Sequence, residues 1–152
     1  MKQTQRAFTL IEILIVLAII LILLGITLVS MRGLQSSREL QTITDSIAAK
    51  LEEARTNAMS GKNGVPYGVT FASTSYTYWY GTSYSASSTN NIVLPISSNF
   101  VINTTLPSYT VSFARITGNP SATGTTTITS ITNTSTTDSI KIGTYGDITV
   151  IK

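Results

Sequence analysis

The sequence of 152 residues contains no cysteine and no histidine, and only 11% of its residues are charged. Without cysteine there can be no disulfide, no thiolate nucleophile and no Cys-based zinc site. Without histidine as well, the usual hydrolytic triads lack both an imidazole and a thiol. Residues 64–152 hold only two acidic side chains, Asp138 and Asp147. The sequence therefore predicts that the protein is not an enzyme, and we expect no cofactor.

Asp138 and Asp147 have two possible chemical interpretations, a carboxylate pair and a calcium site. Asp147 lies in a Tyr-Gly-Asp sequence, where turn formation accounts for it. No acidic cluster of the EF-hand type is present in the sequence. We therefore expect no metal site.

One long apolar run dominates the N-terminal part of the chain. Residues 13–31 carry no charge, and these 19 positions correspond to about 28 Å of helix, which matches a bilayer core. Lys2 and Arg6 precede the run, and Glu12 stands near its start. The pattern predicts membrane insertion, with residues 8–31 as a single transmembrane segment. The expected location is the inner (cytoplasmic) membrane, with the head, residues 64–152, outside the cytoplasm.

Two simpler interpretations of this run explain less. A secretory signal has an apolar region of about 7–15 residues and a small-x-small cleavage site, whereas this run is longer and has no such site. A plain signal anchor fits the hydrophobicity but leaves Glu12 unexplained. A carboxylate costs about 2.5–3.5 kcal/mol at the centre of a membrane helix, and less near the interface.

The stretch Arg6-Ala7-Phe8-Thr9-Leu10-Ile11-Glu12 resembles the class III leader and cleavage junction of type IV pilins and pseudopilins. The resemblance implies that residues 1–7 are a leader, removed by a prepilin peptidase between Ala7 and Phe8, and that Phe8 is then N-methylated. Glu12 becomes the fifth mature residue, and its implied role is an ion pair with the Phe8 amine of a neighbouring subunit. Ala7 departs from the glycine that is usual in the family.

Beyond the apolar run the pattern becomes amphipathic. The apolar positions recur at spacings of three and four, which places them on one helical face; they are Leu40, Ile43, Ile47, Leu51, Ala54 and Ala58. Ser60 to Gly64 supplies a stop signal. We expect one helix over about 8–60, with 8–31 as its transmembrane or filament-core half and 32–63 as its amphipathic half and cap.

Gly25 and Gly33 are the weak points of the expected helix, because each costs up to about 1 kcal/mol relative to alanine. They permit either close packing against other helices or local melting of the helix in a filament. Both interpretations remain open from the sequence.

Residues 64–152 predict an antiparallel β head, which gives an α+β, pilin-like fold. Short β-prone runs alternate with Gly, Pro and Asn turn signals. The two runs Tyr67–Phe71 and Tyr76–Tyr80 read as a hairpin. The further candidate strands are Ile92–Ile96, Phe100–Asn103, Thr110–Arg115, Thr126–Thr132, Ser139–Ile142 and Ile148–Ile151.

A second resemblance concerns the family's subgroups. The helix end Leu51–Ser60 followed by Tyr67–Phe71 is similar to H-type pseudopilins of type II secretion and to FimT-type minor pilins. The segments Phe113–Gly118 and Tyr145–Val150 are similar in style to later strands of that group.

DNA binding is a further alternative, because some FimT-type minor pilins take up DNA. Its candidate residues are the cations Lys62, Arg115, Lys141 and Lys152 and the aromatics Tyr76, Tyr78, Trp79, Tyr80 and Tyr84. Alternating aromatics in a strand more often pack across strands, and four scattered cations make a thin patch.

These observations favour a structural subunit of a type IV pilus or of a type II secretion pseudopilus. Its expected partners are other pilin or pseudopilin subunits, the prepilin peptidase and, before assembly, the inner membrane. The alternative from another class is a signal-anchored, monomeric β-domain that binds a carbohydrate or a protein partner.

Overall fold

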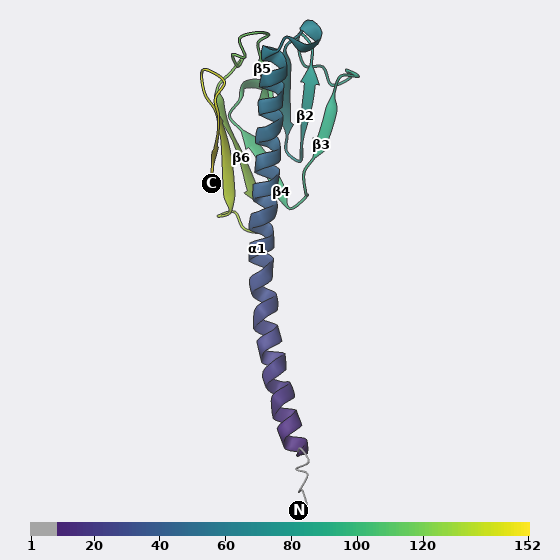
Figure 1. Ribbon diagram of the computed structural model, residues 1–152, viewed down its shortest axis with the longest axis vertical. Helices are drawn as coiled ribbons and strands as arrows, with labels where there is room; N and C mark the ends of the chain where they lie inside the picture. The colour runs from purple at the N-terminus through teal and green to yellow at the C-terminus, as the bar shows by residue number, and fades with distance from the viewer. Residues whose placement is uncertain (1–8) are drawn as a thin grey trace, which may run out of the picture. The chain divides into compact units, whose positions relative to one another are not determined.

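The computed structural model describes residues 9–152, except for the side chains of residues 25–34. Contacts divide the chain after Ser36 into two units, which we treat separately. The described chain contains one α-helix, two short 3-10 turns and eight strands (Figure 1). Their bounds are α1 Leu10–Met59, η1 Lys62–Gly64, β1 Tyr67–Ala72, β2 Ser75–Tyr80, β3 Ile92–Pro95, β4 Phe100–Thr104, η2 Pro107–Tyr109, β5 Thr110–Phe113, β6 Gly124–Ser130, β7 Thr137–Ile142 and β8 Ile148–Ile151.

The helix predicted over about 8–60 is confirmed within one or two residues at each end. Gly61 terminates it in the left-handed conformation, with a φ of 68°, and its amide donates to the carbonyl of Ala58. Gly25 and Gly33 are both helical. Their surroundings lie outside the described side chains, so close packing and local melting both stay predictions.

The eight strands form two antiparallel sheets. One has the order β3-β2-β1-β5 and the other the order β4-β6-β7-β8. The predicted hairpin is confirmed: β1 pairs with β2 from Tyr67 opposite Tyr80 to Ala72 opposite Ser75, which leaves a two-residue turn. The other six predicted strands are also present, with ends shifted by no more than two residues. An α+β fold with an antiparallel β head is therefore confirmed.

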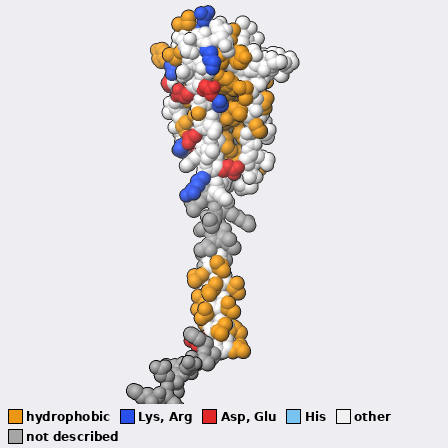
Figure 2. Space-filling view, turned by 45° about the vertical axis from the view of Figure 1, so that its right-hand side comes forward, with side chains coloured by type: hydrophobic (Ala, Val, Ile, Leu, Met, Phe, Trp, Pro, Cys, Tyr) orange, Lys and Arg blue, Asp and Glu red, His pale blue; other side chains and the backbone are white. Residues whose placement is uncertain are grey.

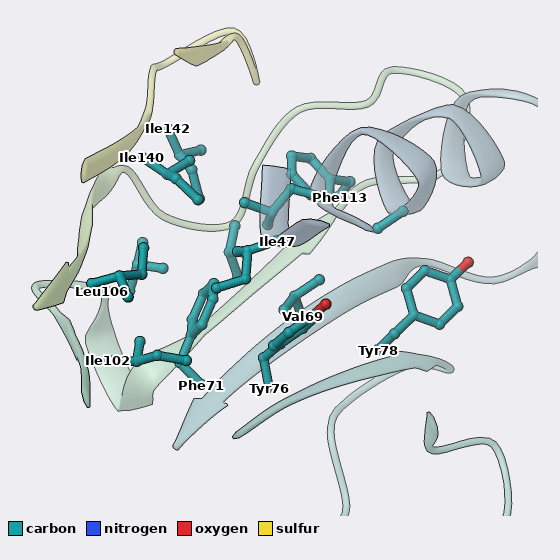
Figure 3. Packing of buried hydrophobic residues seen from close by; sticks show 14 of the residues in the cluster. Ile47, Val69, Phe71, Tyr76, Tyr78, Ile102, Leu106, Phe113, Ile140 and Ile142 are labelled. Carbon is teal, nitrogen blue, oxygen red and sulfur yellow. The ribbon is translucent and has the colours of Figure 1, made fainter. Parts of the chain in front are cut away.

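The amphipathic part of α1 packs on both sheets and closes the core of the head (Figures 1 and 3). Ile47, Leu51, Ala54 and Ala58 are fully buried, as the three-and-four spacing predicted. The sheets contribute Phe71 and other apolar side chains that point towards Ile47. The buried Thr44 satisfies its hydroxyl by donating to the carbonyl of Leu40.

The outer face of β1 and β2 is closed by aromatic packing. Trp79 is 3% exposed, donates its indole N–H to Thr70 and lies 5.9 Å from the ring of Tyr84. Gly68 makes room for it, since a Cβ there would lie 2.5 Å from the indole and 2.6 Å from the carbonyl oxygen of Val111. The loop after β2 thus helps to cover this face.

Within the described residues, no helical stretch combines the length and the hydropathy that crossing a membrane requires. The predicted transmembrane segment 8–31 falls partly outside those residues, at position 8 and at the side chains from 25 onward. It therefore stays a prediction, as do the domain bounds drawn from it.

Candidate functional site: the start of α1 and the end of the head

The first turn of α1 is capped by a residue that the sequence reasoning missed. The amide of Glu12 donates to the Thr9 hydroxyl at 3.3 Å and to the Thr9 carbonyl at 3.1 Å. Thr9 is therefore the N-cap and Glu12 the third helical residue, which gives one of the two hydrogen bonds of a capping box. The Thr-x-x-Glu spacing in the sequence was the signal that could have identified it. Glu12 also lies at the positive end of the helix dipole, where a carboxylate is favourable.

The helix surface after Glu12 is apolar on every side. Each leucine, isoleucine and valine from Leu10 to Ile22 is at least 44% exposed. A helix that is apolar all round belongs either in a membrane or in the core of a larger assembly. Glu12 is the one acidic residue among positions 9–24. Its side chain is exposed, like those of its apolar neighbours.

The predicted processing site lies outside the described residues. Ala7 and Phe8, the two residues of the cleavage junction, fall within 1–8. The cleavage and the N-methylation of Phe8 therefore stay predictions, and so does the ion pair between Glu12 and the Phe8 amine.

At the other end of α1, three segments from distant parts of the sequence meet around Arg55. Its guanidinium donates to the carbonyl of Tyr145 at 2.9 Å, while its Nε is buried and has no hydrogen-bond partner. Gly118 and Gly146 both have a positive φ and no room for a side chain. A Cβ on Gly118 would lie 2.6 Å from Met59, and one on Gly146 would lie 2.8 Å from Arg55.

This junction joins the three segments on which the subgroup resemblance was based. They are the helix end Leu51–Ser60 and the segments Phe113–Gly118 and Tyr145–Val150, which lie far apart in the sequence. The amide of Ile116 donates to the carbonyl of Ala58, which ties the second segment to the first. The glycines were visible in the sequence, but their proximity depends on sheet order, which the sequence does not reveal.

The two aspartates weighed as a metal site are not brought together. Asp147 is exposed at the β7–β8 turn, beside Gly143, whereas Asp138 is 6% exposed near the start of β7. Gly143 follows Asp138 by five positions, which correspond to about 16 Å of strand. Among the residues that the structure describes, no three metal-ligating side chains form a cluster. One carboxylate oxygen of Asp138 is buried without a hydrogen-bond partner.

The residues considered for DNA binding are also separated. Tyr76, Tyr78 and Trp79 are at least 94% buried, so they cannot stack on bases without opening the head. Tyr78 accepts a hydrogen bond from Asn57. The Nζ of Lys152 lies 3.8 Å from a carboxylate oxygen of Asp45, so this cation has an acidic neighbour within its own head.

Two of the four cations, Lys62 and Arg115, adjoin the same residue, Gly61. Arg115 lies against Gly61, next to Lys62, with its Nε 3.8 Å from the position of a Cβ on Gly61. Lys141 lies on β7, opposite Thr125 and Thr149. Three of the five candidate aromatics are therefore closed off from bases in the described head, whereas Tyr80 and Tyr84 are partly exposed.

Comparison with known proteins gives results for both parts of the chain. Residues 2–28 match the family model of the prokaryotic N-terminal methylation motif. The chain is similar to the crystal structure of the type IV minor pilin FimU from Pseudomonas aeruginosa, with a TM-score of 0.60 and 15% identity over 76% of this chain and 90% of that one. It is also similar to the minor pseudopilin EpsH of the type 2 secretion system of Vibrio cholerae, with a TM-score of 0.56 and 13% identity over 74% of this chain and 96% of that one. No curated protein sequence matches significantly.

The two findings are complementary, because one concerns the N-terminal sequence and the other the fold. The motif match spans residues 2–28, which include the predicted cleavage junction and most of the apolar run, and the shared fold covers about three quarters of the chain. At 13–15% identity the structural matches establish the fold alone. The chain thus carries a prokaryotic N-terminal methylation motif and shares its fold with the minor pilin FimU and the minor pseudopilin EpsH.

Proposed function

We propose that the chain is made as a prepilin, is processed between Ala7 and Phe8, and is assembled as a structural subunit into a pilus or pseudopilus filament. The observation that carries the proposal is the helix surface from Leu10 to Ile22, where each leucine, isoleucine and valine is at least 44% exposed. Exposed apolar area costs about 25 cal/mol per Å², so this surface needs a cover. Lipid supplies one before assembly, and the helices of neighbouring subunits supply one afterwards.

Glu12 would fix the register in which the helices of neighbouring subunits pack against each other. Inside an apolar bundle, a carboxylate without a partner is destabilising, and an amine placed beside it offsets the desolvation of both charges. The proposed amine is the N-terminus at Phe8 of a neighbouring subunit, which exists only after cleavage. A subunit that enters out of register leaves Glu12 unpaired. The carboxylate therefore selects both processed and correctly placed subunits.

The proposal also assigns locations. Before assembly the chain spans the inner membrane once, with the head outside the cytoplasm, and afterwards it belongs to the filament. The methylation motif supports this assignment, because the motif is one of membrane-inserted prepilins.

The test compares Glu12→Ala with the unchanged chain in cells that produce it. We expect normal amounts of the Glu12→Ala chain in the membrane, with its N-terminus cleaved, and its loss from sheared filaments. Glu52→Ala is the matched control, because Glu52 is an exposed glutamate of the same helix in the head. Normal amounts of the Glu12→Ala chain in sheared filaments would contradict the proposed role of Glu12.

Mass spectrometry of the N-terminus separates the proposal from the signal-anchored binding module. A chain that begins with methylated Phe8 supports the filament subunit. An intact Met1 supports the anchored monomer and refutes processing.

A further inference from the structure

The end of the head around Arg55 exposes apolar side chains within a basic rim. Met59, Ile116 and Tyr145 are 47%, 64% and 79% exposed. Arg115 and Lys62 lie beside them, since both adjoin Gly61. Figure 2 shows hydrophobic and basic side chains at the upper end of the head. We call Met59, Ile116, Tyr145, Lys62 and Arg115 the tip patch.

The tip patch is held in place by tight packing beneath it. Met59 rests on Gly118, whose positive φ and lack of space exclude a side chain. Tyr145 is fixed through its carbonyl, which accepts a hydrogen bond from Arg55. Loops that merely connect strands do not need such packing. The arrangement is instead what a preorganised contact surface requires.

Ile116 adds an independent sign of function. Its φ is +72°, which is rarely adopted by a β-branched residue. Backbone strain of this kind persists where the surrounding structure imposes it, and it concentrates at functional positions. Here the strained residue buries little of its side chain within its own head. The strain therefore presents an apolar group to solvent, where only another molecule can cover it.

A second feature of the head is complementary to the tip patch. A groove of about 300 Å³ runs between α1 and the β2–β3 side of the sheet, and its lining includes Ile43, Tyr76, Pro95, Ile96 and Glu39. We call it the flank groove. Figure 2 shows hydrophobic side chains along the head beside the charged side chains. The flank groove offers apolar walls and a carboxylate, whereas the tip patch offers apolar side chains and two cations.

We propose that the tip patch of one copy docks into the flank groove of a second copy, with Arg115 or Lys62 facing Glu39. Along α1 the two surfaces are 16 residues apart, from Ile43 to Met59, which is about 24 Å. They therefore cannot meet within one head. A contact between two different surfaces of identical copies is heterologous, and it propagates as a ring or a helical filament. The proposal rests on the proposed function as a filament subunit and adds the contact between heads.

The apolar character of the tip patch favours a protein partner over nucleic acid. Phosphate binding is carried by clustered cations. The patch has two cations at its rim, and its centre consists of Met59, Ile116 and Tyr145. Such a centre needs an apolar counterpart, which a groove lined by Ile43, Tyr76 and Ile96 supplies.

The absence of cysteine allows a direct test by cross-linking. Ile116→Cys is combined with Thr42→Cys, because Thr42 is an exposed residue that lines the flank groove. A disulfide needs the two Cα atoms within about 7 Å. Positions 42 and 116 of one head are too far apart, since Ile116 bonds to Ala58, about 24 Å along α1 from Thr42. Any disulfide between the two positions must therefore join two copies.

Filaments sheared from cells that produce the full-length double variant are oxidised and analysed without reductant. We expect a ladder of disulfide-linked multimers. Each single variant should give at most a dimer, and the control pair of Ile116→Cys with the exposed Thr149→Cys should give no ladder. Chains present in the filaments without a ladder would overturn the docking and leave the proposed function standing. Absence of the unchanged chain from filaments would overturn both.

Charge reversal tests the same contact without cysteines. Arg115→Glu and Glu39→Arg should each deplete the chain from filaments if Arg115 faces Glu39, and the two together should restore it. Lys62→Glu with Glu39→Arg tests the other pairing in the same way. If neither double variant restores incorporation, the proposed pairing is wrong. Salt-sensitive retention of a duplex oligonucleotide that Arg115→Glu abolishes, without any ladder, would assign the patch to nucleic acid and refute the docking.

Discussion

The first and last parts of α1 contrast sharply although they belong to one helix. From Leu10 to Ile22 every large aliphatic side chain is substantially exposed, whereas from Ile47 to Ala58 the apolar face is fully buried under two sheets. The difference lies in the pattern, because the first stretch is apolar all round and the second is apolar on one face only. A one-sided stripe can be covered by a small β head. An apolar cylinder needs neighbours on every side.

The contrast separates two sources of stability. The head buries its own core and should unfold as a unit whose stability depends on that core. The first stretch contributes exposed apolar area, which becomes favourable only when lipid or other helices cover it. Substitutions in the two parts should therefore be detected by different measurements.

The largest expected effect comes from truncating the core of the head. Phe113 is fully buried, so Phe113→Ala should lower the free energy of unfolding by about 3–5 kcal/mol. Leu17 is 55% exposed, and Leu17→Ala should change the same quantity by about 0.5 kcal/mol or less. Urea denaturation of the full chain in detergent measures both effects. The fluorescence of Trp79, the single tryptophan, reports on the head. Equal losses would mean that the two parts unfold together.

A smaller loss in the free energy of unfolding should appear at alkaline pH, and it should arise from the head alone. Burial raises the pKa of Tyr76 and of Tyr78 above the ordinary value of 10.0. Below that value both the folded and the unfolded chain keep the phenolic protons. As the pH rises through it, the unfolded chain loses them first. The free energy of unfolding should therefore be constant up to about pH 9 and fall above about pH 10.

Tyr76→Phe isolates one contribution to this fall. The variant should lose stability less steeply than the unchanged chain, in urea denaturation repeated between neutral pH and about pH 11. Tyr109→Phe is the control, because Tyr109 is 63% exposed. An identical fall in the Tyr76→Phe variant would mean that Tyr76 takes no part in the alkaline loss.

The sequence predicted most elements of this fold because their periodicities are strong. The three-and-four spacing from Leu40 to Ala58 located the helix face, and alternation with turn signals located all eight strands. The order of the strands could not be predicted, since short antiparallel strands with similar Thr-rich patterns fit several topologies. The proximity of Gly118, Gly146 and Arg55 depends on that order and was missed for this reason.

At the candidate site, the sequence predicted those residues that belong to a local motif. The methylation motif around Phe8 and Glu12 was recognised, and Thr9 could have been found from its spacing to Glu12. The aromatics of β2 were a weaker case, because alternation alone does not reveal which faces are covered. Trp79 is covered by the ring of Tyr84 and fits against the backbone of Gly68, which has no side chain in the way. No sequence pattern marks this contact among three residues.

The smallest expected effect concerns Ile116 and has the opposite sign. Ile116→Gly should remove backbone strain of about 1–3 kcal/mol and lose about 0.5–1 kcal/mol through the greater freedom of glycine in the unfolded chain. The head should therefore gain roughly 1 kcal/mol. Ile131 is the matched control, since it is 59% exposed and its φ is not positive. Ile131→Gly should lose about 0.5–1 kcal/mol in the same urea denaturation. If Ile116→Gly destabilised the head as much as Ile131→Gly, no strain would be stored there. A more stable head that enters filaments less well would instead show that Ile116 is kept in this conformation for a contact outside its own head.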